Sequence, residues 1–229
     1  MADTKKYILD ACLKYFLQHG IRKMSNEKLV TLLGISTKTI YKHFKNKEKL
    51  LEEVLHLYHD HRYETLQKLS PGQNAACLLF DIWRYAIETE PKVSKLFYQD
   101  LNYYYPKLAE KVELSISKKF SDKFIEIIRQ GIEEGVFRHD IIPEVVLEGI
   151  YALYISIVRQ KHYRYLSVSL SEVLMNMIAV YFRGFCTDKG IKILDKHISQ
   201  FKSSQKNNVL KKEVSESVEH NNIARSKKH

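Results

Sequence analysis

The chain is 229 residues long, which allows a small module joined to a larger one, and its eight glycines and four prolines disfavour an all-β fold with many tight turns. The formal net charge of +10 lies at the two ends, because residues 1–50 hold 11 Lys and Arg against four Asp and Glu, and residues 196–229 hold eight against three. A basic first module on a near-neutral body is typical of a protein that meets a polyanion.

The first fifty residues predict three short helices and the start of a long fourth one. Apolar residues recur at helical spacing over residues 5–18, and His19-Gly20 ends this first helix. Each of the next three predicted helices follows a good N-cap: Ser25 before 26–33, Ser36 before 37–44, and Asn46 before 47–69. Because the second and third helices are joined by a turn that contains Gly34, they form a helix-turn-helix.

The rest of the chain also has the 3.6-residue period of helices. We expect helices over 75–87, from Pro91 to a stop at Pro106, over 106–134, over 143–158, and from an N-cap at Ser171 through Phe185. The last two are apolar on more than one face, which favours burial against a second subunit. From Ser199 onward polar residues dominate and no apolar stripe continues.

These patterns predict an all-α fold with three parts. Residues 1–47 are expected to be a helix-turn-helix DNA-binding domain, residues 48–198 a helical dimerisation domain, and residues 199–229 a disordered basic tail. The cysteines Cys12, Cys77 and Cys186 form no disulfide framework, the amino terminus has no signal peptide, and no apolar run reaches the ~18 residues of a membrane span. We therefore expect a cytoplasmic protein that does not enter a membrane.

The outer face of the third helix carries the functional argument. If Ile40 and Phe44 are its buried pair, the helical period turns Lys38 and Lys42 away from the core, with Thr39 on the same side. Thr37 and Tyr41 flank that face. An α-helix fits the major groove of DNA, where Lys can donate to guanine and Thr can offer its hydroxyl or its methyl group. The partner we expect is therefore a double-stranded DNA operator.

The residues around this helix make the stretch similar to a known family. Gly34-Ile35-Ser36, then Thr39-Ile40-Tyr41, His43-Phe44 and Lys47-Glu48-Lys49-Leu50-Leu51 resemble the signature of the tetracycline-repressor (TetR) family of bacterial regulators, and Gly20 and Ser25 also match. The family's usual Leu is Ile40 here. The resemblance implies these DNA contacts: Thr37, Lys38, Thr39 and Lys42 at bases or nearby backbone, and Tyr41, His43 and Lys47 at phosphates. Ser25 and Ser36 complete the predicted DNA-binding set.

The resemblance also implies a homodimer in which residues 48–198 form a C-terminal helical effector-binding (ligand-binding) and dimerisation domain that senses a small molecule. Gly131-Ile132-Glu133-Glu134-Gly135-Val136-Phe137-Arg138 looks like a stretch common in the bodies of this family. We expect a repressor that sits on a palindromic operator and is released by a small apolar effector of unidentified structure. The residues predicted to line the effector pocket are Trp83, Phe97, Tyr98 and Tyr104. No cofactor is expected.

Three other interpretations were weighed: a metal site, an enzyme, and a DNA-binding protein without a ligand. The cluster of His56, His59, Asp60 and His61 offers helical spacing for a metal site, but no partner at a diagnostic spacing completes four ligands. An enzyme is not expected, because the chain has no nucleophile-elbow, phosphate-loop or zinc-protease motif. A DNA-binding structural or division protein of the same fold, without a ligand, is the alternative function.

Overall fold

The computed structural model describes residues 2–69, 72–89, 93–159, 168 and 170–201. In these ranges the chain is helical, apart from turns and one isolated bridge between Phe137 and Cys186, which confirms the all-α prediction. The helices are α1 (Ala2–His19), α2 (Asn26–Leu33), α3 (Thr37–His43), α4 (Lys47–Lys68), α5 (Ala75–Thr89), α6 (Lys95–Tyr104), α7 (Pro106–Glu133), α8 (Pro143–Arg159) and α9 (Leu170–Phe185). A further helical segment spans residues 188–201.

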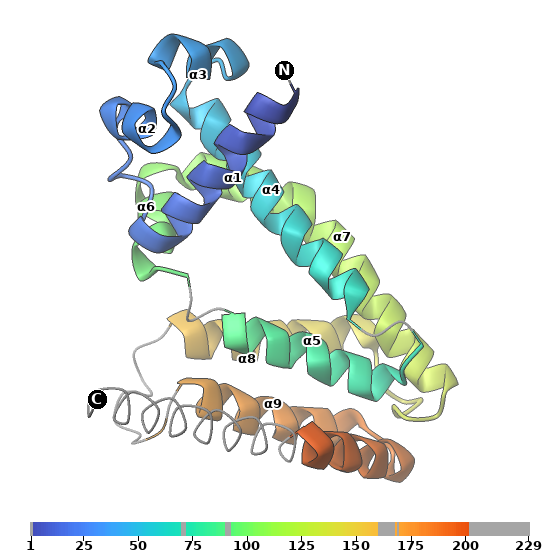
Figure 1. The fold of residues 1–229 in the computed structure, drawn as a ribbon. Helices are drawn as coiled ribbons and strands as arrows, with labels where there is room; N and C mark the ends of the chain where they lie inside the picture. Colours follow the sequence, from blue (N-terminus) through green and yellow to red (C-terminus); the bar gives the residue numbers. More distant parts are fainter. Residues whose placement is uncertain (1, 70–71, 90–92, 160–167, 169, 202–229) are drawn as a thin grey trace, which may run out of the picture.

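The helices form a small head and a larger body joined by α4. In Figure 1, α1, α2 and α3 lie together at one end, and α4 descends from them beside α7 to the other end. There α5, α8 and α9 run across the molecule in successive layers. α6 belongs to the middle of the sequence but lies against α1 in the head.

Two hydrophobic clusters hold these parts together. The first contains apolar residues of α1 to α4 and also Phe97, Leu108 and Val112 from α6 and α7. The second contains apolar residues of α5, α7, α8, α9 and the segment 188–201, with Leu66 from the far end of α4. Because α4 contributes to both clusters, movement at one of its ends is mechanically connected to the other.

The predicted caps of the head are confirmed. The Ser25 hydroxyl accepts a hydrogen bond from the backbone N–H of Lys28 at 3.1 Å, and the Asn46 amide oxygen accepts from that of Lys49 at 2.8 Å. Gly34 follows α2 with a left-handed φ of 64°, and its N–H donates to the Val30 carbonyl. These caps fix where α2 ends and where α4 begins, and so they set the length of the turn before α3.

Four expectations about the body need correction. α9 begins at Leu170, so Ser171 lies inside the helix and is not its N-cap. α6 begins at Lys95 with Ser94 as its N-cap, and Pro91 lies outside the described residues. The segment 188–201 was not predicted, and it includes residues 199–201, which we had assigned to the tail. The rest of the tail, 202–229, lies outside the described residues.

The end of α7 is tied to α5 and α9 by a compact turn. Glu134 accepts hydrogen bonds from the Asn74 side chain at 2.7 Å and from the backbone N–H of Ala75 at 3.0 Å, so it caps the start of α5. The backbone N–H groups of Val136 and Phe137 both donate to the Gly131 carbonyl at 2.9 Å. The stretch from Gly131 to Arg138, which resembles a stretch common in the family, forms the end of α7 and this turn.

No helix in the described ranges has the length and apolar character needed to cross a membrane.

Candidate DNA interface

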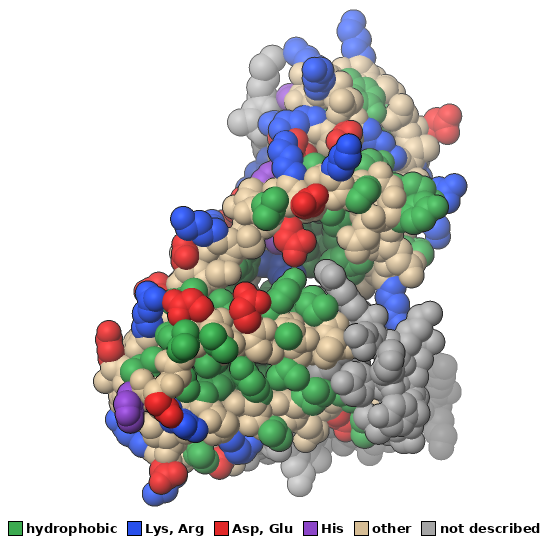
Figure 2. All heavy atoms as spheres, turned by 180° about the vertical axis from the view of Figure 1, so that it is seen from behind, with side chains coloured by type: hydrophobic (Ala, Val, Ile, Leu, Met, Phe, Trp, Pro, Cys, Tyr) green, Lys and Arg blue, Asp and Glu red, His purple; other side chains and the backbone are tan. Residues whose placement is uncertain are grey.

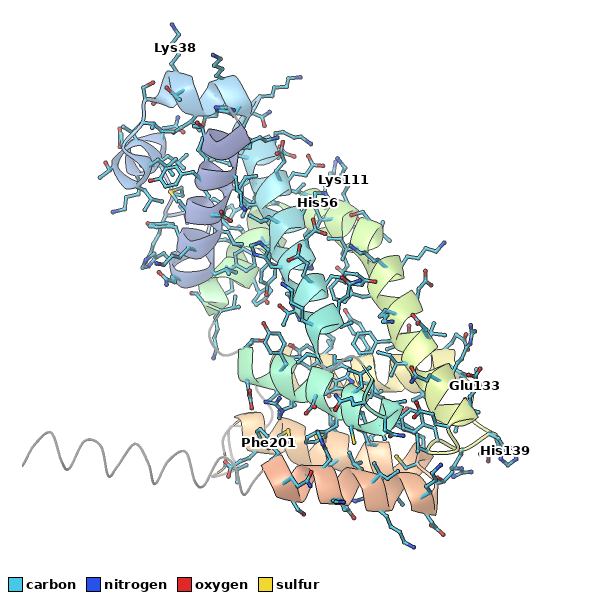
Figure 3. The ribbon with its side chains drawn as sticks, turned by 45° about the vertical axis from the view of Figure 1, so that its right-hand side comes forward. Lys38, His56, Lys111, Glu133, His139 and Phe201 are labelled. Atoms are coloured by element: carbon cyan, nitrogen blue, oxygen red, sulfur yellow. The ribbon has the colours of Figure 1, made fainter. Side chains whose placement is uncertain are left out.

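α3 presents a basic outer surface at the tip of the head. Ile40 and Phe44 are buried, at 0% and 1% exposure, whereas Lys38 and Lys42 are exposed, as predicted. Lys38 extends away from the molecule in Figure 3, and Figure 2 shows several Lys and Arg side chains projecting from the same end. Lys38, Thr39, Tyr41 and Lys42 line an open, shallow hollow on this surface. The two exposed ammonium groups of Lys38 and Lys42 can contact base edges and phosphates in a major groove.

Ser36 and Thr39 also have a structural role. The Ser36 hydroxyl caps α3 by accepting from the backbone N–H of Thr39 at 3.1 Å, and the two hydroxyl groups lie 2.9 Å apart in a further hydrogen bond. Thr39 is therefore only half-exposed, with its hydroxyl oriented by the cap. A contact from Thr39 to a base would use the methyl group or the remaining capacity of this hydroxyl.

Tyr41 joins the two helices of the helix-turn-helix. Its hydroxyl donates to the side-chain oxygen of Asn26 at 2.8 Å, so the first residue of α2 fixes the ring of α3. The sequence analysis did not include Asn26 in the site, although its position directly after the Ser25 N-cap makes it the first residue of α2. His43 is half-buried at the end of α3 and packs near Phe44. Thr37 lies exposed at the start of α3.

Lys47 lies at the start of α4, where a phosphate contact was predicted. Its ammonium group donates to the Met24 carbonyl at 2.5 Å and is part-buried. Burial lowers the pKa of Lys47, and the negative charge of Asp100 opposes this effect. The side chain therefore holds the segment before α2 in place. In the predicted phosphate contact, the same ammonium group and the free N–H groups at the N-terminus of α4 would donate to the phosphate oxygens.

The head is fastened to α6 by a set of contacts that the sequence did not reveal. In the turn after α1, the Arg22 backbone N–H donates to Asp100 at 2.8 Å, and the Arg22 guanidinium donates to the Tyr104 hydroxyl at 2.7 Å. The Ser94 N–H donates to the Leu17 carbonyl at 2.7 Å. Gly20 has a φ of 83°, and a Cβ there would lie 2.7 Å from Asp100 Oδ2 and 3.0 Å from Leu96 Cβ, so glycine suits this close approach. We call this set of contacts the α1–α6 contact.

The four residues predicted to line one effector pocket lie in different places. Trp83 belongs to the hydrophobic cluster of the body, whereas Phe97 and the half-buried Tyr98 belong to that of the head. Tyr104 is 44% exposed and takes part in the α1–α6 contact. The structure does not bring the four together, because α6 packs on α1 rather than beside α5.

The histidine cluster of α4 shows no metal-binding arrangement. Among the described residues, no three His, Cys, Asp or Glu side chains converge as ligands of an ion would. His59 is instead affected by burial, which lowers its pKa to about 4, helped by the charges of Arg62 and His56. It is therefore neutral in the folded protein at neutral pH.

This pKa predicts a dependence of stability on pH. In the unfolded chain His59 takes up a proton near its ordinary pKa of 6.5, so folding stability is present above that pH and is lost as the pH falls towards about 4. Between these two pH values, we expect the free energy of unfolding of His59→Gln to fall by about 3 kcal/mol less than that of wild type. The measurement is urea unfolding across this pH range, with the exposed His139→Gln as the control. Parallel pH curves for wild type and His59→Gln would contradict the assignment.

Comparison with known proteins supports a regulator. Residues 8–54 match the family model described as bacterial regulatory proteins, tetR family. A curated relative, the uncharacterized HTH-type transcriptional regulator YhgD of Bacillus subtilis, is 27% identical over 164 residues, which are 68% of this chain and 83% of the relative. The HTH-type transcriptional regulator AcrR of Shigella flexneri is 34% identical over 55 residues, 24% of this chain and 26% of that protein.

Solved structures share the fold over most of the chain. A putative transcriptional regulator from Saccharomonospora viridis in complex with choline has a TM-score of 0.63 at 16% identity, covering 82% of this chain and all of that one. SmeT, the repressor of the Stenotrophomonas maltophilia multidrug efflux pump SmeDEF, has a TM-score of 0.61 at 16% identity, covering 80% of this chain and 91% of that one. At these identities the likeness concerns the fold.

Proposed function

We propose that this chain, a DNA-binding transcriptional regulator of the TetR family, is a ligand-responsive repressor that binds a palindromic operator as a homodimer. The observation that carries the proposal is the basic outer surface of α3, with Lys38 and Lys42 exposed at the tip of a well-capped helix-turn-helix. It acts in the cytoplasm, where bacterial DNA lies. A small apolar effector that binds in the body releases it from DNA.

An apolar surface on the body supports the homodimer. Val145 and Tyr151 on α8 and Val180 on α9 are 61%, 45% and 72% exposed, and Ile142 just before α8 is 61% exposed. Figure 2 shows hydrophobic side chains gathered over the half of the molecule where α8 and α9 lie. A second copy that covers this surface would supply the second α3 helix that a palindromic operator requires.

Two connections support coupling between body and head. α4 runs for 22 residues without Gly or Pro, from the Lys47 end beside α3 to Leu66 in the body cluster. The Glu52 carboxylate of α4 accepts hydrogen bonds from Lys111 of α7 and from Lys49, and these lower its pKa to about 2. A change in the body that moves α7 or α6 would therefore be passed to α3 through α4 and through the α1–α6 contact.

The experiment that tests the proposed function compares two kinds of lysine. Operator sequence is first found by selecting bound DNA from a random library. Lys38→Ala should then cost ~1–3 kcal/mol for each half-site and relax its sequence preference, because a base contact is lost. Lys47→Met keeps the aliphatic stem and should weaken binding to all sequences alike, flattening the salt dependence by about one unit of slope per protomer.

Lys118→Ala is the matched control for these variants, because Lys118 is exposed on α7, away from the head. It should leave affinity, preferred sequence and salt dependence as in wild type. Loss of sequence preference in Lys118→Ala, or its retention in Lys38→Ala, would argue against α3 as the helix that reads DNA.

A further inference from the structure

The side chain of Thr39 on α3 is held in place by the residue that caps its helix. The Ser36 hydroxyl accepts a hydrogen bond from the backbone N–H of Thr39 at 3.1 Å, and the hydroxyl groups of the two residues lie 2.9 Å apart in a second hydrogen bond. The second bond turns the Thr39 oxygen back towards the N-cap and favours a single side-chain rotamer. The Thr39 hydroxyl therefore already has a partner inside the protein before any DNA is bound.

This arrangement leaves the methyl group of Thr39 for contact with a ligand. The oxygen and the methyl group leave the Cβ atom in different directions, so the methyl group takes no part in the bond to Ser36. Thr39 is half-exposed and is one of the residues that line the open hollow on the outer surface of α3. A methyl group that is already held in one rotamer loses little conformational entropy when a ligand covers it.

The other residues of the hollow surround this methyl group with donors and with one fixed ring. The Tyr41 hydroxyl donates to the Asn26 side chain at 2.8 Å, which fixes the ring of Tyr41. Lys38 and Lys42 are exposed, and an ammonium group can donate hydrogen bonds but cannot accept them. The hollow therefore combines one fixed methyl group with two ammonium donors.

Thymine is the base whose major-groove edge matches this combination. It is the only one of the four bases of DNA that carries a methyl group there, at C5, and its neighbouring O4 atom is an acceptor. Cytosine has no C5-methyl group and presents an amino donor, which an ammonium group cannot pair with. The hollow is therefore better suited to thymine than to cytosine at the same position.

We propose that Thr39 determines part of the operator sequence by packing its methyl group on the C5-methyl group of a thymine in each half-site. The proposal rests on the DNA-binding function proposed above and names one base of the operator and the group that reads it. The Thr39 hydroxyl stays with Ser36 and makes no contact with the base. Lys38 and Lys42 donate to acceptors of that thymine and of the bases beside it.

Deoxyuridine tests this contact, because it differs from thymidine only in lacking the C5-methyl group. Each thymine of the selected operator half-site is replaced in turn by deoxyuridine, and binding of the full-length protein is measured by fluorescence anisotropy at one salt concentration. At the thymine that faces Thr39, wild type should lose about fourfold in affinity for one half-site and about fifteenfold when both are changed, as expected for one buried methyl group per half-site.

Two variants of Thr39 separate its methyl group from its hydroxyl. Thr39→Ser keeps the hydroxyl and lacks the methyl group, so it should bind the thymine and deoxyuridine operators with equal affinity. Thr39→Val keeps a methyl group and lacks the hydroxyl, so it should retain the fourfold difference. The matched control is Thr65→Ser, which removes the same methyl group on α4, where the Thr65 hydroxyl donates to the His61 carbonyl at 2.8 Å. It should respond to deoxyuridine as wild type does.

The wild-type series gives an answer even if a variant does not fold. A preferred half-site without thymine, the absence of any loss with deoxyuridine, or a difference that Thr39→Ser retains and Thr39→Val loses would each overturn the proposal. Failure of the proposed function gives a different result, because Lys38→Ala would then keep the sequence preference of wild type. A relaxed preference in Lys38→Ala together with binding that ignores deoxyuridine would leave α3 as the reading helix and refute only the Thr39 contact.

Discussion

Replacing Val180 with glutamate is expected to convert the proposed dimer to a monomer and to weaken operator binding by a factor of about 10²–10⁴. Val180 on α9 is 72% exposed in one protomer, on the apolar surface that the second copy would cover. A carboxylate there would be buried without a partner on association, twice in each symmetric dimer. The monomer would keep its contacts to a half-site and lose the gain from binding two half-sites together.

The matched control is Leu114→Glu, because Leu114 is 69% exposed on α7, outside the α8 and α9 surface. Sedimentation should show a dimer for wild type and Leu114→Glu and a monomer for Val180→Glu, with far-ultraviolet circular dichroism alike for all three. Binding to a duplex with one half-site should then be similar for the three proteins. A dimeric Val180→Glu protein would place the interface on another face.

Gly131→Ala is expected to lower the free energy of unfolding by about 3 kcal/mol, a typical upper cost of overpacking a core. A Cβ at Gly131 would fall inside the van der Waals distance of the Phe137 ring. That ring is 2% exposed, and its backbone is held by the hydrogen bond to the Gly131 carbonyl and by the bridge to Cys186. It therefore cannot move aside without breaking the turn between α7 and α8.

Gly135→Ala in the same turn separates this steric effect from backbone strain. Gly135 has a φ of 67° and open space around it, so alanine there should cost only ~1 kcal/mol, and Gly135→Asn less. Urea unfolding of the three variants gives the comparison. Equal losses for Gly131→Ala and Gly135→Ala would show that Phe137 can repack.

The head was predictable because its signals are local. Ser25, Ser36 and Asn46 each cap a helix through a hydrogen bond to a residue three positions later, and such bonds are visible as a spacing in the sequence. The outward placement of Lys38 and Lys42 follows from the burial of Ile40 and Phe44 on a helix of known period.

The segment 188–201 could have been found by the same reasoning. The Thr187 hydroxyl accepts from the Gly190 N–H at 3.1 Å, which is an N-cap, and Ile191, Leu194 and Ile198 continue an apolar stripe. The segment was missed because its first turn, Asp188-Lys189-Gly190, is polar and contains glycine.

The position of α6 could not be predicted, because it depends on contacts between residues far apart in the chain. Arg22 and Asp100 are 78 positions apart, and nothing in either segment specifies the other. For this reason the sequence predicts one pocket lined by Trp83, Phe97, Tyr98 and Tyr104. The fold places the last three of these residues in the head.

The shared core of the head limits how this regulator could be recombined with others. Phe97, Leu108 and Val112 complete a cluster whose other members come from α1 to α4, so a chimaera joined at residues 47 and 48 would pair a foreign head with these three side chains. A junction in the second half of α4, between Leu55 of the head cluster and Leu66 of the body cluster, would still leave α6 facing an unfamiliar α1. Transplanting the operator preference onto another sensor would therefore work best by exchanging only the exposed residues of α3, which leave both cores and the α1–α6 contact intact.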